Sequence, residues 1–166
     1  MWRRSQVFIA LGFAFFAFLS SAQTPQCKPG DVMGVEHGRD YILNICGAGL
    51  VALRGVEPPL RSANVARPPL GGGELLGGKN VGPEAVAFLS KIVGQRVTLV
   101  YDGYRIGDLE GRRYAYVYLP DKTFVNTQMI RQGYGYADRQ GSHPRREEFI
   151  AIEASARRLK VGVWGT

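Results

Sequence analysis

The stretch RYAYVYL, residues 113–119, decides the fold of this chain. Ala115, Val117 and Leu119 alternate with three tyrosines, and such alternation is typical of a β-strand that presents two different faces. The segment RVTLVY at residues 96–101 lies before it across a polar turn and predicts a second strand, because it is rich in β-branched residues. These two segments predict a pair of neighbouring strands in the second half of the chain.

Three helices are predicted around this pair of strands. The first begins at Gly82-Pro83-Glu84 and ends at Gly94, with apolar residues at helical spacing between them. The second covers residues 125–132 and ends at the glycine that follows. The third begins at His143-Pro144 and ends at Gly162, with an apolar stripe along one side.

Three further strands are predicted in the first half of the chain, at residues 31–36, 41–45 and 50–56, and their short turns indicate a meander. Pro58-Pro59 ends the last of them. Residues 61–80 follow as a long loop rich in glycine and proline, which we interpret as a functional flap or a flexible insertion. The order of elements predicts an α+β, mainly β fold, with a small closed barrel and helices packed on one side.

Composition limits the class of protein. The chain has 166 residues, of which 45% are hydrophobic and 21% charged, so one globular domain is expected rather than a disordered chain. The 21 lysines and arginines exceed the 14 acidic residues and give a formal net charge of +7. This excess of positive charge favours an anionic partner.

The N-terminus has the layout of a secretory signal peptide. Arg3 and Arg4 precede an apolar stretch at residues 7–19, and small residues at 20–22 form a cleavage site. We therefore expect a signal peptide at 1–22, a tail at 23–30 and one domain at 31–166, in a secreted or periplasmic monomer without a membrane span. A short membrane anchor is the alternative, although the stretch is short for a span.

Cys27 and Cys46 are the two cysteines of the chain. In an oxidising compartment such a pair suggests one disulfide, which would tie the N-terminal tail to the body of the domain. Two free thiols are the alternative. A cysteine pair at this spacing makes no metal-binding signature by itself.

The chain resembles the staphylococcal nuclease (thermonuclease-like) family over roughly residues 32–164, most specifically from Gly82 onward. The resemblance rests on GPEA at 82–85, GRRYAYVY at 111–118, FVN at 124–126, IRQG at 130–133 and GVW at 162–164. It implies a five-stranded OB-fold barrel with three helices. It also implies a nuclease that cuts DNA and RNA phosphodiesters, usually with Ca²⁺, and a catalytic role for Arg112 at a retained family position.

The first half of the chain departs from the family's pattern at the residues that carry the chemistry. Residues 37–40 read HGRD, so Arg39 stands where the resemblance implies a metal-ligating aspartate. Residues 52–60 read ALRGVEPPL, with Ala52 in place of a phosphate-binding arginine and Leu60 in place of the glutamate proposed as general base. The active site is therefore interpreted as degenerate.

These replacements argue against the family's usual mechanism. Arginine repels a hard divalent cation that prefers several oxygen ligands. Leucine has no lone pair, and losing a general base costs on the order of 10²–10⁴-fold in rate. Losing a phosphate clamp removes a further transition-state contact. We expect bound Ca²⁺ to be weak or absent in this chain.

Neighbouring residues offer a possible rearrangement of the site. Glu57 keeps a carboxylate at a metal position, and Asp40 follows the lost ligand, although turning Asp40 inward by a bulge would disturb the alternation of the next strand. Glu36 and Glu74 are further carboxylates. Arg54 lies two residues from Ala52, on the same strand face, and is a candidate substitute for the missing catalytic arginine.

A binding surface is the other feature that the resemblance implies. OB barrels hold single strands where cations follow phosphates and aromatic rings stack on bases. Arg39, Arg105, Arg112 and Arg113 lie in segments that border the family's groove and are candidate nucleic-acid ligands; for Arg105 and Arg113 a solvated basic face is an equal alternative. The tyrosines of 113–119 favour core packing over a stacking ladder.

Three functional hypotheses follow. The first is an exported domain that binds single-stranded DNA or RNA, or a similar polyanion, with calcium-dependent cleavage lost or much weakened. The second is a divergent metal-dependent phosphodiesterase that uses Glu57 with another carboxylate, and Arg54 with Arg112. The third is a protein-interaction domain of the envelope, in which the loop at 61–80 carries the contact.

Overall fold

The computed structural model describes residues 27–37, 40–59, 82–103 and 111–165. Five strands form a mixed sheet in the order β1-β2-β3-β6-β5, and two short strands, β4 and β7, form a second sheet. The bounds are β1 Val32–His37, β2 Tyr41–Ile45, β3 Gly49–Leu53, β4 Val56–Glu57, α1 Gly82–Ser90, β5 Thr98–Val100, β6 Arg113–Tyr118, α2 Val125–Arg131, β7 Tyr136–Ala137, α3 Arg146–Arg158 and the 3₁₀ helix η1 Gly162–Trp164. The mainly β arrangement of five strands with three helices is confirmed.

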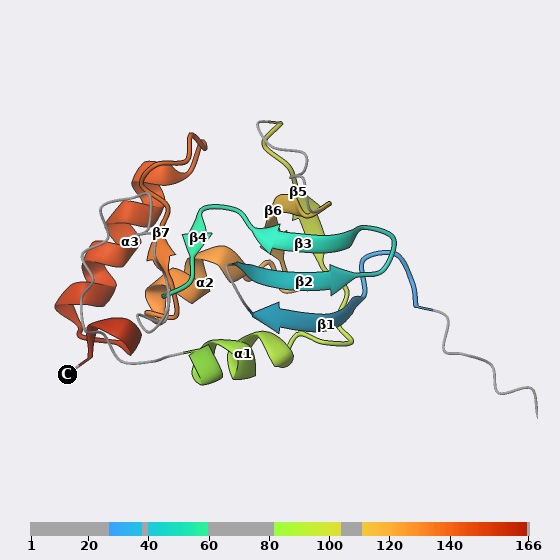
Figure 1. The fold of residues 1–166 in the computed structure, drawn as a ribbon, viewed down its shortest axis with the longest axis horizontal. Helices are drawn as coiled ribbons and strands as arrows, with labels where there is room; N and C mark the ends of the chain where they lie inside the picture. The colour runs from blue at the N-terminus through green and yellow to red at the C-terminus, as the bar shows by residue number, and fades with distance from the viewer. Residues whose placement is uncertain (1–26, 38–39, 60–81, 104–110, 166) are drawn as a thin grey trace, which may run out of the picture.

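The first three strands form the predicted meander, with antiparallel pairing of β1 to β2 and of β2 to β3. Strand β3 then pairs in parallel with β6, and β6 pairs antiparallel with β5. Figure 1 shows the meander strands side by side, with α1 running along β1 and with β4 and β7 next to α3. This topology brings the end of β3 and the start of β6 together.

The two edges of the five-stranded sheet approach each other at the start of β1. Asp31 and Arg96 form an isolated bridge, and the backbone N–H of Val32 donates to the carbonyl of Gln95 over 2.9 Å. Within the described residues, β1 and β5 do not continue this bridge into a ladder. The closed barrel therefore stays a prediction.

The core lies between the sheet and the helices, as the alternation of the strands requires. Leu43 and Ile45 of β2, Val51 of β3 and Val117 of β6 are fully buried. Tyr116, on the opposite face of β6 from Val117, is also buried and packs edge-on against Phe124 and Phe149. Tyr118 stacks on the Phe124 ring, so the tyrosines at positions 116 and 118 pack within the protein.

Asn126 of α2 ties the helix to the junction of β3 and β6. Its Oδ1 accepts a hydrogen bond from the N–H of Val117, and its Nδ2 donates to the carbonyls of Arg54 and Ala115 over 2.9 and 3.2 Å. A fully buried amide with every bond satisfied fixes its neighbours in register. Asn126 thereby holds the backbone of Arg54 in place.

Two predicted strands are shorter than expected. The stretch 50–56 is interrupted after Leu53 by Gly55, whose φ of +76° belongs to the left-handed region that favours glycine. A Cβ at Gly55 would lie 2.6 Å from Cε1 of His143, so no other residue fits. The chain turns there, and β4 joins the second sheet. The stretch 96–101 is reduced to Thr98–Val100.

The N-terminal tail is anchored by a disulfide between Cys27 and Cys46, whose Cα atoms are 6.0 Å apart. Cys46 directly follows β2, so the bridge fastens the tail to the turn between β2 and β3. The predicted signal peptide at 1–22 and the loop at 61–80 lie outside the described residues. No helix in the described ranges is long and apolar enough to cross a membrane.

Removing this disulfide is expected to lower the free energy of unfolding by about 2–4 kcal/mol, because a closed loop of this length restricts the unfolded chain. The measurement is urea denaturation of the wild-type protein beside a Cys27→Ser/Cys46→Ser variant. An unchanged midpoint in the variant would mean that the tail contributes nothing to the stability of the domain.

Candidate functional site

Arg112, which directly precedes β6, forms an ion pair with Asp40, which directly precedes β2. The Nη1 of Arg112 lies 2.9 Å from Oδ2 of Asp40, and the two side chains are only 11% and 19% exposed. Asp40 directly precedes β2, whose Tyr41 and Leu43 remain fully buried. Asp40 therefore reaches the arginine without disturbing the alternation of the strand.

Ala52 lies in the middle of β3, where the resemblance implies a phosphate-binding arginine. It pairs with Ile42 on one side and with Tyr114 on the other, and it is completely buried. A buried methyl group can neither attract nor hydrogen-bond a phosphate. This position contributes packing to the sheet and no charge to the site.

Arg54 is held inside the protein by two partners. Its Nε donates to Oδ2 of Asp102 over 2.8 Å, and its Nη2 donates to the carbonyl oxygen of Ser142 over 2.7 Å. The two charged side chains are 6% and 3% exposed. This arrangement argues against Arg54 as a substitute phosphate ligand, because a phosphate would have to break a buried ion pair to reach it. Arg54 instead connects the end of β3 to the segments after β5 and before α3.

Glu57 of β4 is a half-buried carboxyl group among other acids. Burial raises its pKa to about 7, and the carboxylates of Asp138, Asp40 and Glu153 add to the increase by repulsion. Glu57 pairs through its backbone with Tyr136 of β7. Glu57 therefore belongs to the second sheet, lies within electrostatic range of Asp40, and is partly protonated at neutral pH.

Glu57→Gln is expected to stabilise the protein at alkaline pH and to leave its stability unchanged at acidic pH. The unfolded carboxyl ionises near pH 4.5 and the folded one near 7, so the wild type loses stability as pH rises between these values. With partial exposure taken into account, the gain above pH 8 is about 1–2 kcal/mol. Thermal unfolding of both proteins at pH 4 and pH 8 measures it. A constant difference across this range would contradict the assignment.

The described side chains do not fit a calcium site. Ca²⁺ takes about six to eight oxygen ligands. Asp40 is paired with Arg112, and no group of three or more His, Cys, Asp or Glu side chains in the described ranges is arranged to hold a metal ion. The residue expected at the lost metal position, Arg39, lies outside these ranges.

The remaining predicted residues are distributed as follows. Arg113, the first residue of β6, is exposed and pairs through its backbone with Val51. Arg105, Leu60 and Glu74 lie outside the described residues, as Arg39 does. Of the candidate nucleic-acid ligands, the structure thus describes Arg112 and Arg113, which are adjacent in sequence at the start of β6.

Sequence reasoning missed Asp102, the partner of Arg54, and Glu153, a fully buried carboxylate of α3. Glu153 accepts hydrogen bonds from the N–H of Ala137 and from the side chains of Arg139 and Arg157. Glu153 could have been noticed in the sequence, because it is an acidic residue within the apolar stripe of the third predicted helix. Nothing local marked Asp102, because its partner is 48 residues away.

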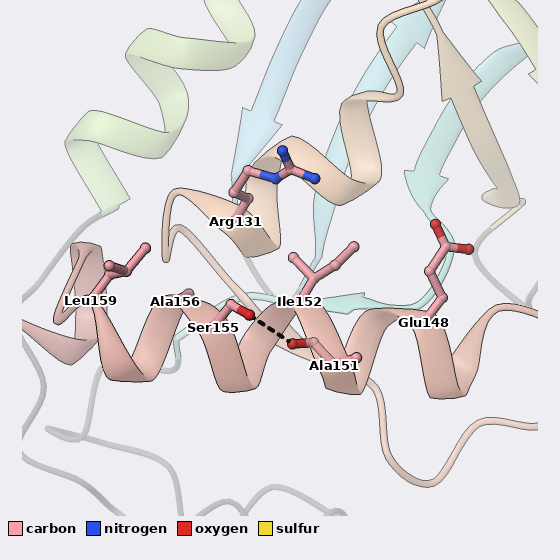
Figure 2. Close-up of a pocket in the computed structure, with 7 residues that line it drawn as sticks. All are labelled: Arg131, Glu148, Ala151, Ile152, Ser155, Ala156 and Leu159. Carbon is pink, nitrogen blue, oxygen red and sulfur yellow. Dashed lines mark hydrogen bonds between the residues drawn. The ribbon is translucent and has the colours of Figure 1, made fainter.

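A hollow beside α3 lies outside this candidate site. Figure 2 shows Arg131 of α2 above Ile152 and Ala156 of α3, with Glu148 and Leu159 farther along the helix. One arginine, one glutamate and several aliphatic side chains line it, and none of them belongs to the site around Arg112. The hollow supplies no arrangement of groups for phosphodiester chemistry.

The comparisons with known proteins agree with this geometry. The family model described as staphylococcal nuclease homologue matches residues 51–166. Because the match covers well over half of the chain, the protein belongs to the staphylococcal nuclease homologue family. This family is calcium-dependent in general, and the mixed sheet with three helices is consistent with its OB-fold. A search of curated proteins found no significant match.

Proposed function

We propose that this protein is an exported nuclease-family domain that binds single-stranded nucleic acid, or a similar polyanion, and has lost most or all calcium-dependent cleavage. Membership of the family supports a nucleic-acid ligand. The net charge of +7 favours electrostatic binding of a polyanion, which does not depend on nucleotide sequence. The disulfide at Cys27 supports an oxidising compartment, and hence export.

The observation that carries this proposal is the engagement of Arg54. Phosphoryl transfer is accelerated by cations that stabilise the charge of the transition state. With Ala52 buried in β3 and Arg54 bound to Asp102 and Ser142, neither position offers a second guanidinium beside Arg112. A single arginine can bind a phosphate, but it supplies only part of the stabilisation that cleavage needs.

Arg112 is the residue through which we expect a phosphate to bind. A phosphate oxygen can replace the Asp40 carboxylate at its guanidinium, since this pair is more exposed than the pair of Arg54 with Asp102 and both anions accept the same hydrogen bonds. The exposed Arg113 beside it adds positive charge that favours the rest of the bound nucleic-acid strand. Binding of this kind requires no metal ion and does not depend on the nucleotide sequence.

A second candidate function is supported by the carboxylates. Asp40 is close enough to Glu57 for its negative charge to raise the pKa of Glu57. Two interacting carboxylates attract a divalent cation, which would lower this pKa again. A divergent metal-dependent phosphodiesterase built on this pair with Arg112 is therefore the alternative outcome of a cleavage assay.

The proposal is tested by binding of a fluorescent single-stranded oligonucleotide to the mature protein in EDTA, at several salt concentrations. We expect binding that weakens with salt, with a log–log slope of about −0.7 for each phosphate neutralised. A slope near zero would mean that no phosphate is contacted, and it would favour a protein-interaction domain instead.

A further inference from the structure

Two arginines on the C-terminal side of the fold share one buried carboxylate. Nη2 of Arg139, which follows β7, lies 3.0 Å from Oε1 of Glu153, and Nη2 of Arg157 lies 2.6 Å from the same oxygen. The Nε of Arg157 also donates to this oxygen over 2.9 Å. The second oxygen, Oε2, accepts from the N–H of Ala137 over 2.8 Å. Both guanidiniums therefore lie side by side around a fixed point.

The burial of the three side chains differs sharply. Glu153 is 1% exposed, whereas Arg139 and Arg157 are 42% and 44% exposed. The carboxylate thus fixes the arginines from below, while large parts of both guanidiniums face solvent. Two positive charges against one negative charge leave the group with a net positive charge at the surface.

The guanidinium of Arg157 is also fixed from the side. Its Cζ lies 4.0 Å from the centroid of the Trp164 ring, a close cation–π contact, and this ring packs edge-on against Tyr136 at 5.1 Å. A guanidinium held in one orientation loses less conformational freedom when it binds an anion. The group is therefore organised before any ligand arrives.

Most of the hydrogen-bond donors of these arginines remain available. Each guanidinium carries five N–H groups. Within the described residues, Arg139 uses one nitrogen for Glu153 and Arg157 uses two. The others can donate to oxygens of a ligand, and two adjacent guanidiniums match the several acceptor oxygens of a phosphate group.

This group is connected to the candidate site through the second sheet, β4 and β7. Tyr136, which packs on Trp164, pairs through its backbone with Glu57, and the charge of Glu153 contributes to the raised pKa of Glu57. A nucleic-acid strand bound at Arg112 would have to continue past β4 and β7 to contact the two arginines.

We infer that Arg139 and Arg157, held by Glu153, form a second phosphate subsite for the backbone of a bound single strand. This inference rests on the proposed function, because it extends the same ligand. The ligand is a pair of phosphodiester oxygens other than the one at Arg112. Neither arginine is part of the family pattern on which the resemblance was based.

The test is the salt dependence of binding for a single strand of about 16 nucleotides, long enough for an OB-fold groove. Arg139→Gln and Arg157→Gln, separately and together, are compared with the wild type. We expect the log–log slope to become less negative by about 0.7 for each phosphate contact that is lost. Arg145→Gln is the matched control, because Arg145 is also a half-exposed arginine paired with a glutamate, Glu148.

Arg139→Lys separates a phosphate contact from a structural role. Lysine keeps the charge but loses the planar fork, so the slope should stay at the wild-type value even if the protein becomes less stable. Thermal unfolding of each variant identifies those that fold. Should the double variant fail to fold, the Arg139→Gln and Arg139→Lys pair alone decides the outcome.

The results separate the subsite from the proposed function. Suppose that Arg139→Gln and Arg157→Gln keep the wild-type slope, while Arg112→Gln makes the slope less negative. This result would overturn the subsite and leave the proposed function in place. A wild type that binds no single strand at any salt concentration would overturn both. The inference requires a less negative slope in Arg139→Gln and Arg157→Gln, together with the wild-type slope in Arg145→Gln.

Discussion

Arg54→Leu is expected to lower the free energy of unfolding by about 3–5 kcal/mol. The substitution removes the guanidinium that lies against the buried carboxylate of Asp102, and breaking a buried ion pair by removing one partner has a cost of this size. The variant also loses the bond to the Ser142 carbonyl. Chemical denaturation followed by fluorescence measures the change.

A matched control comes from the surface of the same sheet. Arg96 pairs with Asp31 over 3.2 Å, but these side chains are 57% and 23% exposed, so Arg96→Leu should cost less than about 1 kcal/mol. Adding Asp102→Asn to Arg54→Leu should recover part of the loss, because the amide carries no charge. Equal losses in Arg54→Leu and Arg96→Leu would contradict the buried pair and return Arg54 to the set of candidate ligands.

Asp40→Asn is expected to tighten the binding of single strands by about tenfold, which corresponds to about 1.4 kcal/mol. In the wild type, a phosphate competes with the Asp40 carboxylate for Arg112, and the amide removes both the competing charge and its repulsion of the ligand. Arg112→Gln should weaken binding by about 10–100-fold, because it removes a charged hydrogen-bond donor. Fluorescence anisotropy at constant salt measures both changes.

The control for this prediction is Asp121→Asn. Asp121 lies in the exposed turn that follows β6, and its replacement removes the same single negative charge. A gain in Asp40→Asn that Asp121→Asn reproduces would arise from net charge alone. A gain restricted to position 40 supports direct competition at Arg112.

The strands and helices could be predicted because their signals are local. Alternation in RYAYVYL and the Gly-Pro start of the helix at 82 depend on neighbouring residues, and both elements are present in the structure. The break at Gly55 could not be predicted in the same way. It is enforced by His143 and Phe149, which approach from the other end of the chain.

The candidate site divides in the same manner. Arg112 and Glu57 were found through a motif, since a motif preserves the spacing of residues along the chain. The destination of Arg54 depends on Asp102 and Ser142, and strand spacing alone placed its side chain on the face of Ala52. Glu153 escaped notice because a buried carboxylate is recognised by its partners, which come from two different elements.

We expect a nucleic-acid phosphate to bind at Arg112 without the strand being cut. The most direct measurement follows labelled single-stranded DNA and RNA on a gel during incubation with the mature protein, with Ca²⁺ and with EDTA. We expect intact substrate under both conditions, at protein concentrations where anisotropy shows that the strand is bound. Cleavage that requires Ca²⁺ and disappears in Arg112→Ala or Glu57→Ala would contradict this expectation.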